Sequence, residues 1–377
     1  MIARLAIGFA IALGLSAPLH AEVDPAHAAR RAAQQISSAT IALDEAKGAS
    51  DRVAALTGAV KAFEEGLEAM REGLRRATIR EQAIALEFDA RREEVAQLLG
   101  VLQSMESSPS PLLLLHPAGP LGTARSGMIL SEVTPSLQAR AEELRKQLEE
   151  VALLRSLQEN AVLSLQQGLF GAQDARTELS LAISDRTDLP RRFVEDPDRL
   201  QSLLKGSETL EAFATGLVQE NEASPVSIKD FEATKGTLDL PVLGRILRKF
   251  NEADASGIRR PGLLIAASPL SVVTTPAAAT IRYRGPLLDY GNVIILEPQA
   301  GYLLVIAGLS EVYGEAGEVL LAGDPVGLMG GRAPEAQEFL QKGQNGSSTS
   351  RSETLYIELR QGTSPVDPAP WFAVTKE

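Results

Sequence analysis

Histidine and cysteine are the side chains that most often hold a catalytic metal, and this sequence has few of them. It contains no cysteine and three histidines, which are His20, His27 and His116. The absence of cysteine excludes disulfide bonds, thiolate zinc sites and cysteine nucleophiles. Because no histidine follows His116, the C-terminal domain has no imidazole for metal binding or for acid–base catalysis.

The polar side chains near the C-terminus are instead spaced as in a β-strand. Residues 354–359 alternate between Thr, Tyr or Glu and Leu or Ile, a period of two that predicts a half-buried strand. Gly362 and three prolines follow Arg360, so the strand should stop there. Tyrosine and arginine side chains are common anchors of protein interfaces. Tyr356 and Arg360 are therefore residue types that occur often at protein interfaces.

The composition limits the remaining possibilities. A chain of 377 residues predicts two or more domains. Its net charge of -12 and its lack of a basic patch rich in arginine and aromatic residues argue against a nucleic-acid partner.

The first 21 residues predict a secretory signal peptide. Arg4 gives a short positive head, an apolar run extends from Leu5 to Ala17, and Ala21 offers a cleavage site. The apolar run is short for a bilayer span, so an uncleaved anchor is the weaker alternative. We expect export and cleavage, and a mature protein in the periplasm.

Residues 22–188 predict a long antiparallel coiled-coil hairpin. Apolar residues recur at spacings of three and four along the first arm, which we expect to be unbroken from Val53 to Leu102 apart from a phase slip near residues 77–81. The second arm should begin at Thr134–Pro135. The tip, at about residues 106–134, contains Leu112, Leu113, Leu114 and Leu115. These leucines indicate either an interface or a small cap folded back on the hairpin.

Residues 189–234 predict a connecting and regulatory arm with short amphipathic helices. Its second apolar group is Leu210, Phe213, Leu217 and Val218, and Ser207 should cap that helix. So short a helix must dock its apolar face. It docks either on the surface of the globular domain or in the functional groove of that domain, where it would block access.

Residues 235–377 predict a mostly β domain of short apolar strands separated by glycines. The strands are expected at residues 263–266, 280–283, 292–296, 301–306 and 354–359, with a helix-like insertion at residues 333–342. The fold class is therefore α+β and multidomain, with a helical hairpin followed by a β domain.

Three blocks carry a resemblance to a known family. They read GIRRPGLLIAAS at residues 257–268, DYGNVIIL at residues 289–296, and LYIELR at residues 355–360 with VDPAPW at residues 366–371. The order of strands resembles the LytM (lysostaphin-like) zinc peptidase domain. The whole chain, with its signal peptide and hairpin, resembles the EnvC-type murein hydrolase activators, whose LytM domain has no zinc site.

The resemblance implies that the zinc ligands of the active family fall at Arg260, Leu264 and Tyr356. Its auxiliary histidines fall at Thr354 and Gly308. Arginine and leucine offer no lone pair to a metal, so the resemblance implies a degenerate peptidase domain that is not an enzyme, with no metal and no other cofactor. No spacing suggests a carboxylate site for magnesium or calcium.

In the EnvC-type proteins the former substrate groove binds a cell-wall amidase. The matching positions here are Leu264, Tyr290, Val293, Tyr356 and Arg360, while Pro261 replaces a lysine that is common in the family. Taken singly, Tyr290 and Val293 could equally be sheet-packing residues and Arg360 a solvated charge. The family further implies that the periplasmic loops of FtsX, partner of the ATPase FtsE, hold the hairpin. Peptidoglycan itself is a further candidate ligand.

Two other functions compete with amidase activation in septal peptidoglycan splitting. A zinc endopeptidase of peptidoglycan would need histidines that the domain lacks. A periplasmic adaptor of a transport system also pairs a hairpin with β domains, but adaptors place β segments on both sides of the hairpin. Here nothing β-like precedes residue 29.

Overall fold

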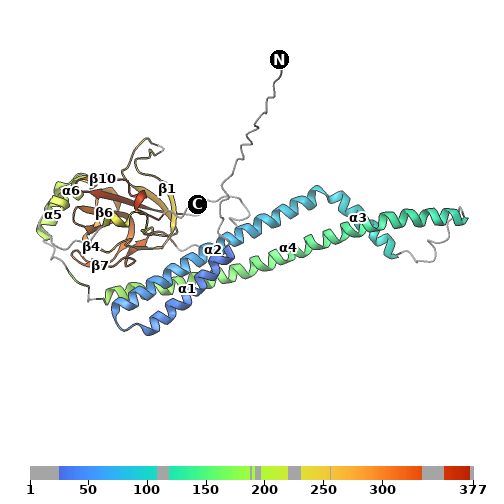
Figure 1. The fold of residues 1–377 in the computed structure, drawn as a ribbon, viewed down its shortest axis with the longest axis horizontal. Coiled ribbons are helices and arrows are strands. Elements are labelled where there is room, and N and C mark those ends of the chain that lie inside the picture. The colour runs from blue at the N-terminus through green and yellow to red at the C-terminus, as the bar shows by residue number, and fades with distance from the viewer. Residues whose placement is uncertain are drawn as a thin grey trace, which may run out of the picture.

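The computed structural model describes residues 25–107, 119–186, 189–191, 197–219, 231–254, 256–332 and 352–373. It consists of an elongated helical part and a β domain beside one end of it (Figure 1). The signal peptide, Leu112 to Leu115 and the insertion at residues 333–342 lie outside the described residues. No described helix combines the length and the apolar character needed to cross a membrane.

The helical part differs from a simple two-armed hairpin. α1 (Pro25–Glu45) folds back on α2 (Ala49–Ala90), so a third helix joins the pair that the sequence predicted. The close approach depends on small side chains, because a Cβ added to Gly66 would lie 3.2 Å from the Cβ of Ala32. The unbroken arm was also a wrong prediction. α2 ends at Arg91, which has a non-helical backbone, and α3 (Arg92–Ser107) changes direction there (Figure 1).

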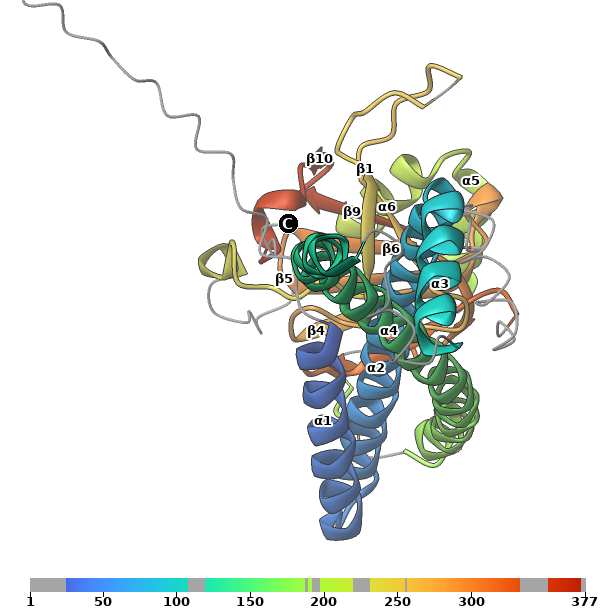
Figure 2. The same ribbon diagram turned by 90° about the vertical axis from the view of Figure 1, so that its right-hand side faces the viewer.

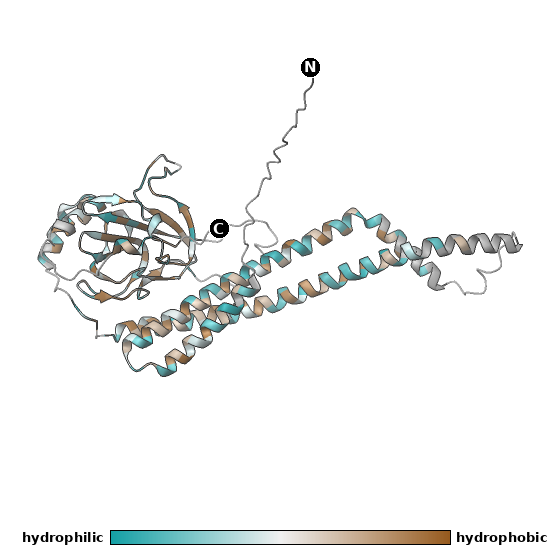
Figure 3. Cartoon of the chain, viewed as in Figure 1, coloured by the Kyte–Doolittle hydropathy of each residue, from teal (hydrophilic) through white to brown (hydrophobic). Residues whose placement is uncertain are grey.

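α4 (Gly119–Ser184) runs antiparallel to α2 and begins earlier than the sequence suggested. Pro135 lies inside it rather than at its first turn. Ion pairs connect the two helices, with Arg80 Nε 2.6 Å from Glu150 and Arg155 Nε 2.9 Å from Glu81. The predicted apolar seam is buried at the end near the β domain, where Leu67 and Leu74 pack with Leu165. Farther along α4 the seam is exposed, and Leu148 and Leu157 lie open to solvent. Figure 3 shows hydrophobic residues recurring among hydrophilic ones along this helix.

The β domain is built on one antiparallel sheet whose main path has the order β1-β2-β9-β6-β5-β4-β7. Its strands are β1 (Gly244–Arg248), β2 (Leu263–Ala267), β3 (Val272–Thr274), β4 (Ala279–Pro286), β5 (Asn292–Gln299), β6 (Tyr302–Val312), β7 (Val319–Leu320), β8 (Pro325–Met329), β9 (Glu353–Gln361) and β10 (Ser364–Val366). The five predicted strands are all present, whereas β1, β3, β7, β8 and β10 were not predicted.

Alternation along the central strands separates two apolar clusters. Leu304 and Ile306 of β6 point into the main core, together with Leu355, Ile357 and Leu359 of β9. The residues between them, Leu303, Val305 and Ala307 of β6 and Tyr356 of β9, lie in a second cluster on the other face. The strand at residues 354–359 is therefore not half-buried as predicted, since both of its faces are covered from Leu355 to Arg360.

The end of the helical part docks on β3 and β8 of the β domain. Val53, Leu56 and Leu179 pack against Val272 and Leu328. One carboxylate connects three segments, because Glu64 Oε1 accepts a hydrogen bond from Arg176 Nη2 of α4 at 3.0 Å and from the backbone N–H of Val272 at 3.0 Å. We call this contact the hairpin base.

Candidate functional site

Two short helices cover the second face of the sheet. They are α5 (Pro197–Gly206) and α6 (Leu210–Gln219), and both lie over the β domain in Figure 1. Leu210, Phe213, Ala214 and Leu217 of α6 pack on a set of sheet residues that we call the covered face: Tyr283, Leu287, Val293, Ile295, Leu303, Val305, Ala307 and Tyr356. Three of the four residues of the predicted apolar group, Leu210, Phe213 and Leu217, lie in this contact. Val218 belongs to α6, but its side chain lies outside the described residues.

Local chemistry explains how α6 begins and why it lies close to α5. The side chain of Thr209 caps the helix by accepting a hydrogen bond from the backbone N–H of Ala212 at 3.1 Å. The cap is therefore Thr209 and not Ser207, as the sequence had suggested. Gly216 allows α5 to pack closely, since an added Cβ would lie 2.3 Å from Cδ1 of Leu203.

Phe213 is the centre of the α6 contact. Its side chain is 0% exposed, and its ring meets that of Tyr283 edge-on with the ring centroids 4.8 Å apart. Such a pair adds to the free energy gained by burying the rings. Phe213 is therefore the residue of α6 on which docking should depend most.

Two arginines of the sheet approach the ends of α6. Arg282 of β4 donates to the backbone carbonyl of Leu217 at 3.5 Å, near the C-terminal end of the helix, where a cation is favourable. Arg360 of β9 lies 3.9 Å from the carboxylate of Glu211 in the first turn. Both contacts are long, so α6 is held mainly by apolar packing.

The polar side chains of β9 form a buried network. Tyr356 Oη donates to Glu358 at 2.7 Å, and Arg360 Nη1 donates to the other oxygen of the same carboxylate at 2.6 Å. Arg360 is 0% exposed, so the interpretation of this residue as a solvated charge is wrong. Burial, followed by the charge of Glu358, raises the pKa of the Tyr356 hydroxyl, which stays a neutral hydrogen-bond donor.

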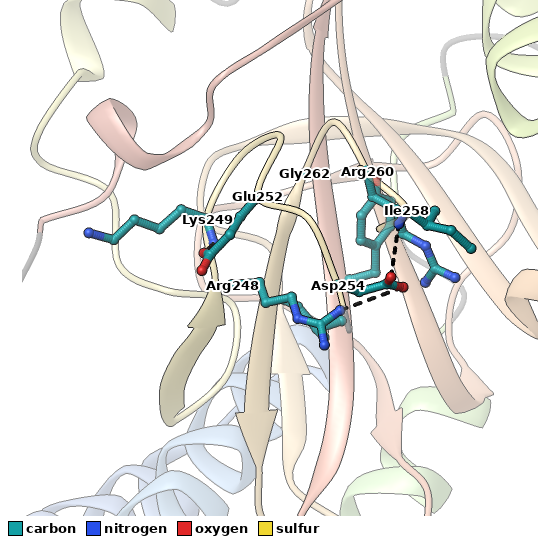
Figure 4. A pocket seen from close by; sticks show the side chains of 9 residues that line it. Arg248, Lys249, Glu252, Asp254, Ile258, Arg260 and Gly262 are labelled. Carbon is teal, nitrogen blue, oxygen red and sulfur yellow. Dashed lines mark hydrogen bonds and ion pairs between the residues drawn. The ribbon is translucent and has the colours of Figure 1, made fainter. Parts of the chain in front are cut away.

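The three predicted zinc-ligand positions come together in the structure. Arg260, Leu264 and Tyr356 line one cavity of about 30 Å³, enough for about one water molecule (Figure 4). Gly262 is needed beside them, because an added Cβ would lie 2.6 Å from the ring of Tyr356. The two auxiliary positions also meet, since an added Cβ on Gly308 would lie 2.5 Å from the carbonyl oxygen of Thr354.

The chemistry of these side chains does not fit a zinc ion. A guanidinium repels a cation, leucine has no donor atom, and the Tyr356 hydroxyl is a neutral donor to Glu358. No cluster of three or more His, Cys, Asp or Glu side chains suited to a metal occurs in the part of the chain that the structure describes.

The predicted amidase-binding residues lie together around α6. Val293 and Tyr356 belong to the covered face, Leu264 and Tyr290 pack at its edge, and Arg360 approaches α6 through Glu211. The Tyr290 and Tyr356 rings are 5.8 Å apart. Sequence reasoning missed Arg282 and Glu358 as members of this site. The signal was a charged residue with an apolar or aromatic neighbour on each side in a strand, and such a residue needs a partner when it is buried.

Comparison with known proteins identifies the β domain. Residues 259–368 match Peptidase family M23, so the chain carries an M23 (LytM-type) domain there. An uncharacterised protein of Neisseria meningitidis, NMB1333, is 25% identical over 146 residues, which are 39% of this chain and 22% of that protein. An uncharacterised protein of Haemophilus influenzae is 30% identical over 139 residues, which are 37% of this chain and 30% of that protein. The chain therefore spans less than a third of the length of either relative.

Solved structures with a similar β domain include Csd3 of Helicobacter pylori, at 20% identity and a TM-score of 0.28, covering 37% of this chain and 36% of that chain. A zinc-containing peptidase of Vibrio cholerae matches at 16% identity and a TM-score of 0.28, covering 36% of this chain and 40% of that chain. The catalytic domain of lysostaphin from Staphylococcus simulans matches at 16% identity and a TM-score of 0.27, covering 34% of this chain and 91% of that chain. The assignment of the domain rests on the family match.

Proposed function

We propose that this chain is a non-enzymatic periplasmic activator of N-acetylmuramoyl-L-alanine amidases, and that it acts in septal peptidoglycan splitting. The observation that carries the proposal is the packing of α6 on the covered face. The predicted amidase-binding residues Val293 and Tyr356 lie beneath this helix, and Leu264 and Tyr290 lie at its edge. In this proposal the amidase binds the same face after α6 has left it.

The chemistry of the former metal site supports the non-enzymatic part of the proposal. Arg260 and Leu264 cannot replace zinc ligands, and a hydrolytic zinc site needs three protein ligands with one position open for water. The domain is therefore better suited to binding a protein than to cutting a cross-link.

The short length of α6 supports an inhibitory role for residues 189–234. α6 has ten residues, and a helix of that length has little stability of its own in water, so its fold depends on docking. Undocking would release both the helix and the face beneath it. Docked and undocked states with different affinities for the amidase are what a population shift requires.

Control of this step is assigned to the helical hairpin. By resemblance, the periplasmic loops of FtsX hold the hairpin, and ATP-driven movement by FtsE reaches α5 and α6 through the segment that follows α4. The predicted signal peptide would deliver the chain to the compartment in which FtsX loops, amidase and peptidoglycan meet.

A dye-release assay on purified sacculi tests the proposal, with the mature chain and the amidase of the same organism. Phe213→Asp places a charge in the apolar contact, and the loss of about 3 kcal/mol or more shifts the docked-to-undocked ratio about a hundredfold. We expect no release by the chain alone, weak release by the wild type with amidase, and release at least about tenfold faster with Phe213→Asp. Ala212→Asp is the matched control, because Ala212 is exposed on the same helix.

Other results would favour the competing functions. Release by the chain without amidase, abolished by a chelator and restored by zinc, would make it an endopeptidase. If neither the wild type nor Phe213→Asp stimulates the amidase, an adaptor or scaffold role is the better assignment.

A further inference from the structure

In the β1–β2 hairpin, β1 and the loop that follows it form a surface that the proposed function does not use. β1 ends the main path of the sheet, and among the described residues no strand pairs with its outer side. The loop between β1 and β2 stands away from the sheet above β1 in Figure 2. None of its residues belongs to the apolar cluster beneath α6. This surface is therefore accessible while α6 is docked.

The charge of this hairpin is opposite to that of the chain. Between residues 245 and 260 there are five cations (Arg245, Arg248, Lys249, Arg259 and Arg260) and two carboxylates (Glu252 and Asp254), a local charge of 5 − 2 = +3. The whole chain carries -12. A positive segment at one edge of an acidic molecule creates a local field that orients charged partners.

Both carboxylates accept hydrogen bonds from groups of the same loop. Asp254 accepts hydrogen bonds from the backbone N–H groups of Ser256 at 2.8 Å and Ile258 at 2.9 Å, and lies 3.8 Å from Arg248. Glu252 accepts one from the backbone N–H of Lys249 at 2.8 Å. Figure 4 marks the contacts of Asp254 with Arg248 and Ile258 and shows the Lys249 side chain extending away from them. These contacts fix the loop without neutralising most of its cations.

Three cationic side chains remain exposed. Those of Arg245, Lys249 and Arg260 form no hydrogen bond or ion pair within the described ranges, although the charge of Arg260 acts on Asp254. Exposed apolar side chains accompany them, with Leu247 40% and Ile258 55% exposed. Apolar groups together with unpaired arginines are typical of a protein interface. The surface also continues into the predicted groove, because Arg260 and Ile258 line the same cavity as Leu264 and Tyr356.

We propose that the β1–β2 hairpin is a second docking surface, which binds an acidic region of the partner amidase while α6 still covers the groove. The inference rests on the proposed function and adds the chemistry of the partner. Arg245, Lys249 and Arg260 attract the acidic region over several ångströms, and Leu247 and Ile258 supply the apolar contact. The amidase is thereby held beside the covered face before α6 leaves.

Charge on an edge strand has a structural use as well, since it hinders strand pairing between copies of a protein. Charge reversal separates the two uses. A glutamate at an edge blocks pairing as well as an arginine does, but it repels an acidic partner.

The test compares Arg245→Glu/Lys249→Glu with the wild type in the full mature chain, and leaves the former zinc positions unchanged. The association rate constant with immobilised amidase is measured from 50 to 500 mM salt, in the wild-type and Phe213→Asp backgrounds. We expect association about tenfold slower at low salt, with the difference disappearing at high salt, because screening shortens the range of charge interactions. Arg245→Gln/Lys249→Gln should give an intermediate rate. Arg30→Glu/Arg31→Glu, the same charge change on α1, should match the wild type within about twofold.

Each other outcome overturns the inference. Equal rates for the β1–β2 and α1 variants, or a defect that is independent of salt, would show that the hairpin does not attract the amidase. Unchanged amidase binding with lost sedimentation on sacculi or anionic vesicles would assign the surface to the wall or the membrane. Failure of the proposed function is distinguishable, because the Phe213→Asp chain would then neither bind nor activate the amidase.

Discussion

The β domain holds helices in two places, and the two contacts differ in kind. At the covered face, α6 packs through apolar side chains, and its polar contacts with Arg282 and Arg360 of the sheet are long, at 3.5 and 3.9 Å. At the hairpin base, Glu64 connects α2, α4 and β3 through two hydrogen bonds of 3.0 Å. Apolar packing tolerates sliding and release, whereas hydrogen bonds to a buried charge demand one geometry.

Further polar contacts at the hairpin base follow the same pattern. Lys61 Nζ donates to Thr274 Oγ1 at 2.9 Å, and the hydroxyls of Ser180 and Tyr313 are 3.0 Å apart. Both join the helical part to the β domain. The hairpin base is therefore suited to remain fixed, and α6 is suited to move. In the proposed mechanism, force on the hairpin would reach the covered face through the chain that follows α4, without detaching the hairpin from the sheet.

Removing the Glu64 carboxylate should have the largest effect on stability. Glu64→Ala leaves Arg176 and the backbone N–H of Val272 buried without their acceptor, which we expect to cost about 3–5 kcal/mol at the hairpin base. Hydrogen exchange at residues 272–274 would report the loss as faster exchange. Glu68→Ala is the control, because Glu68 is 61% exposed and its ion pair with Arg71 should contribute less than about 1 kcal/mol. Equal effects of Glu64→Ala and Glu68→Ala would contradict the view that buried hydrogen bonds fix the hairpin base, and with it the contrast to the covered face.

A smaller effect should appear as a pH dependence of the free energy of unfolding, caused by the titration of Glu64 at the hairpin base. Burial raises the pKa of Glu64 above its ordinary value of 4.5, and Arg176 and the Val272 N–H offset this only in part. The folded chain therefore binds more protons at this site than the unfolded chain. Its stabilising contribution is present below pH 4.5 and is lost as the pH rises through the folded pKa.

Glu64→Gln isolates this titration, because glutamine keeps an oxygen for the Val272 N–H and does not ionise. Measured upward from pH 4.5, the free energy of unfolding of the wild type should fall relative to that of the variant. If the unfolding free energies of the wild type and of Glu64→Gln changed in parallel with pH, Glu64 would not be the group that titrates.

The five central strands of the main path were predictable from the sequence, because alternation and glycines are local signals, whereas the five shorter or peripheral strands were not. The burial of Arg360 was not. Its position in a strand of period two indicated a solvated face, and only the tertiary contacts of β9 show that the face is closed. The division of the first arm into α1 and α2 was also not predictable from local signals. The two helices share one helical pattern, and Gly48 is the only residue at the reversal, residues 46–48, that signals a break.

Some local sequence signals did not decide the structure, because tertiary contacts were stronger. Thr134–Pro135 is typical of a helix start, yet α4 runs through it, so the local signal does not decide where a long helix begins. At the candidate site, the resemblance supplied the positions Arg260, Leu264 and Tyr356, and the structure brings them to one cavity. Arg282 was missed because its contacts with the α6 carbonyl of Leu217 and with Glu297 of the neighbouring strand β5 arise only in the folded domain.

The smallest effect should come from the one carboxylate that α6 directs toward a sheet arginine. Glu211 is 71% exposed and 3.9 Å from Arg360, so solvent screens the pair, and Glu211→Gln should change α6 docking by less than about 0.5 kcal/mol. In the dye-release assay this predicts a change of less than about twofold, against at least about tenfold for Phe213→Asp. Because Arg360 keeps its 2.6 Å hydrogen bond to Glu358, its position in the sheet does not depend on Glu211. A large gain in amidase activation by Glu211→Gln would mean that charge, and not apolar packing, holds α6 on the covered face.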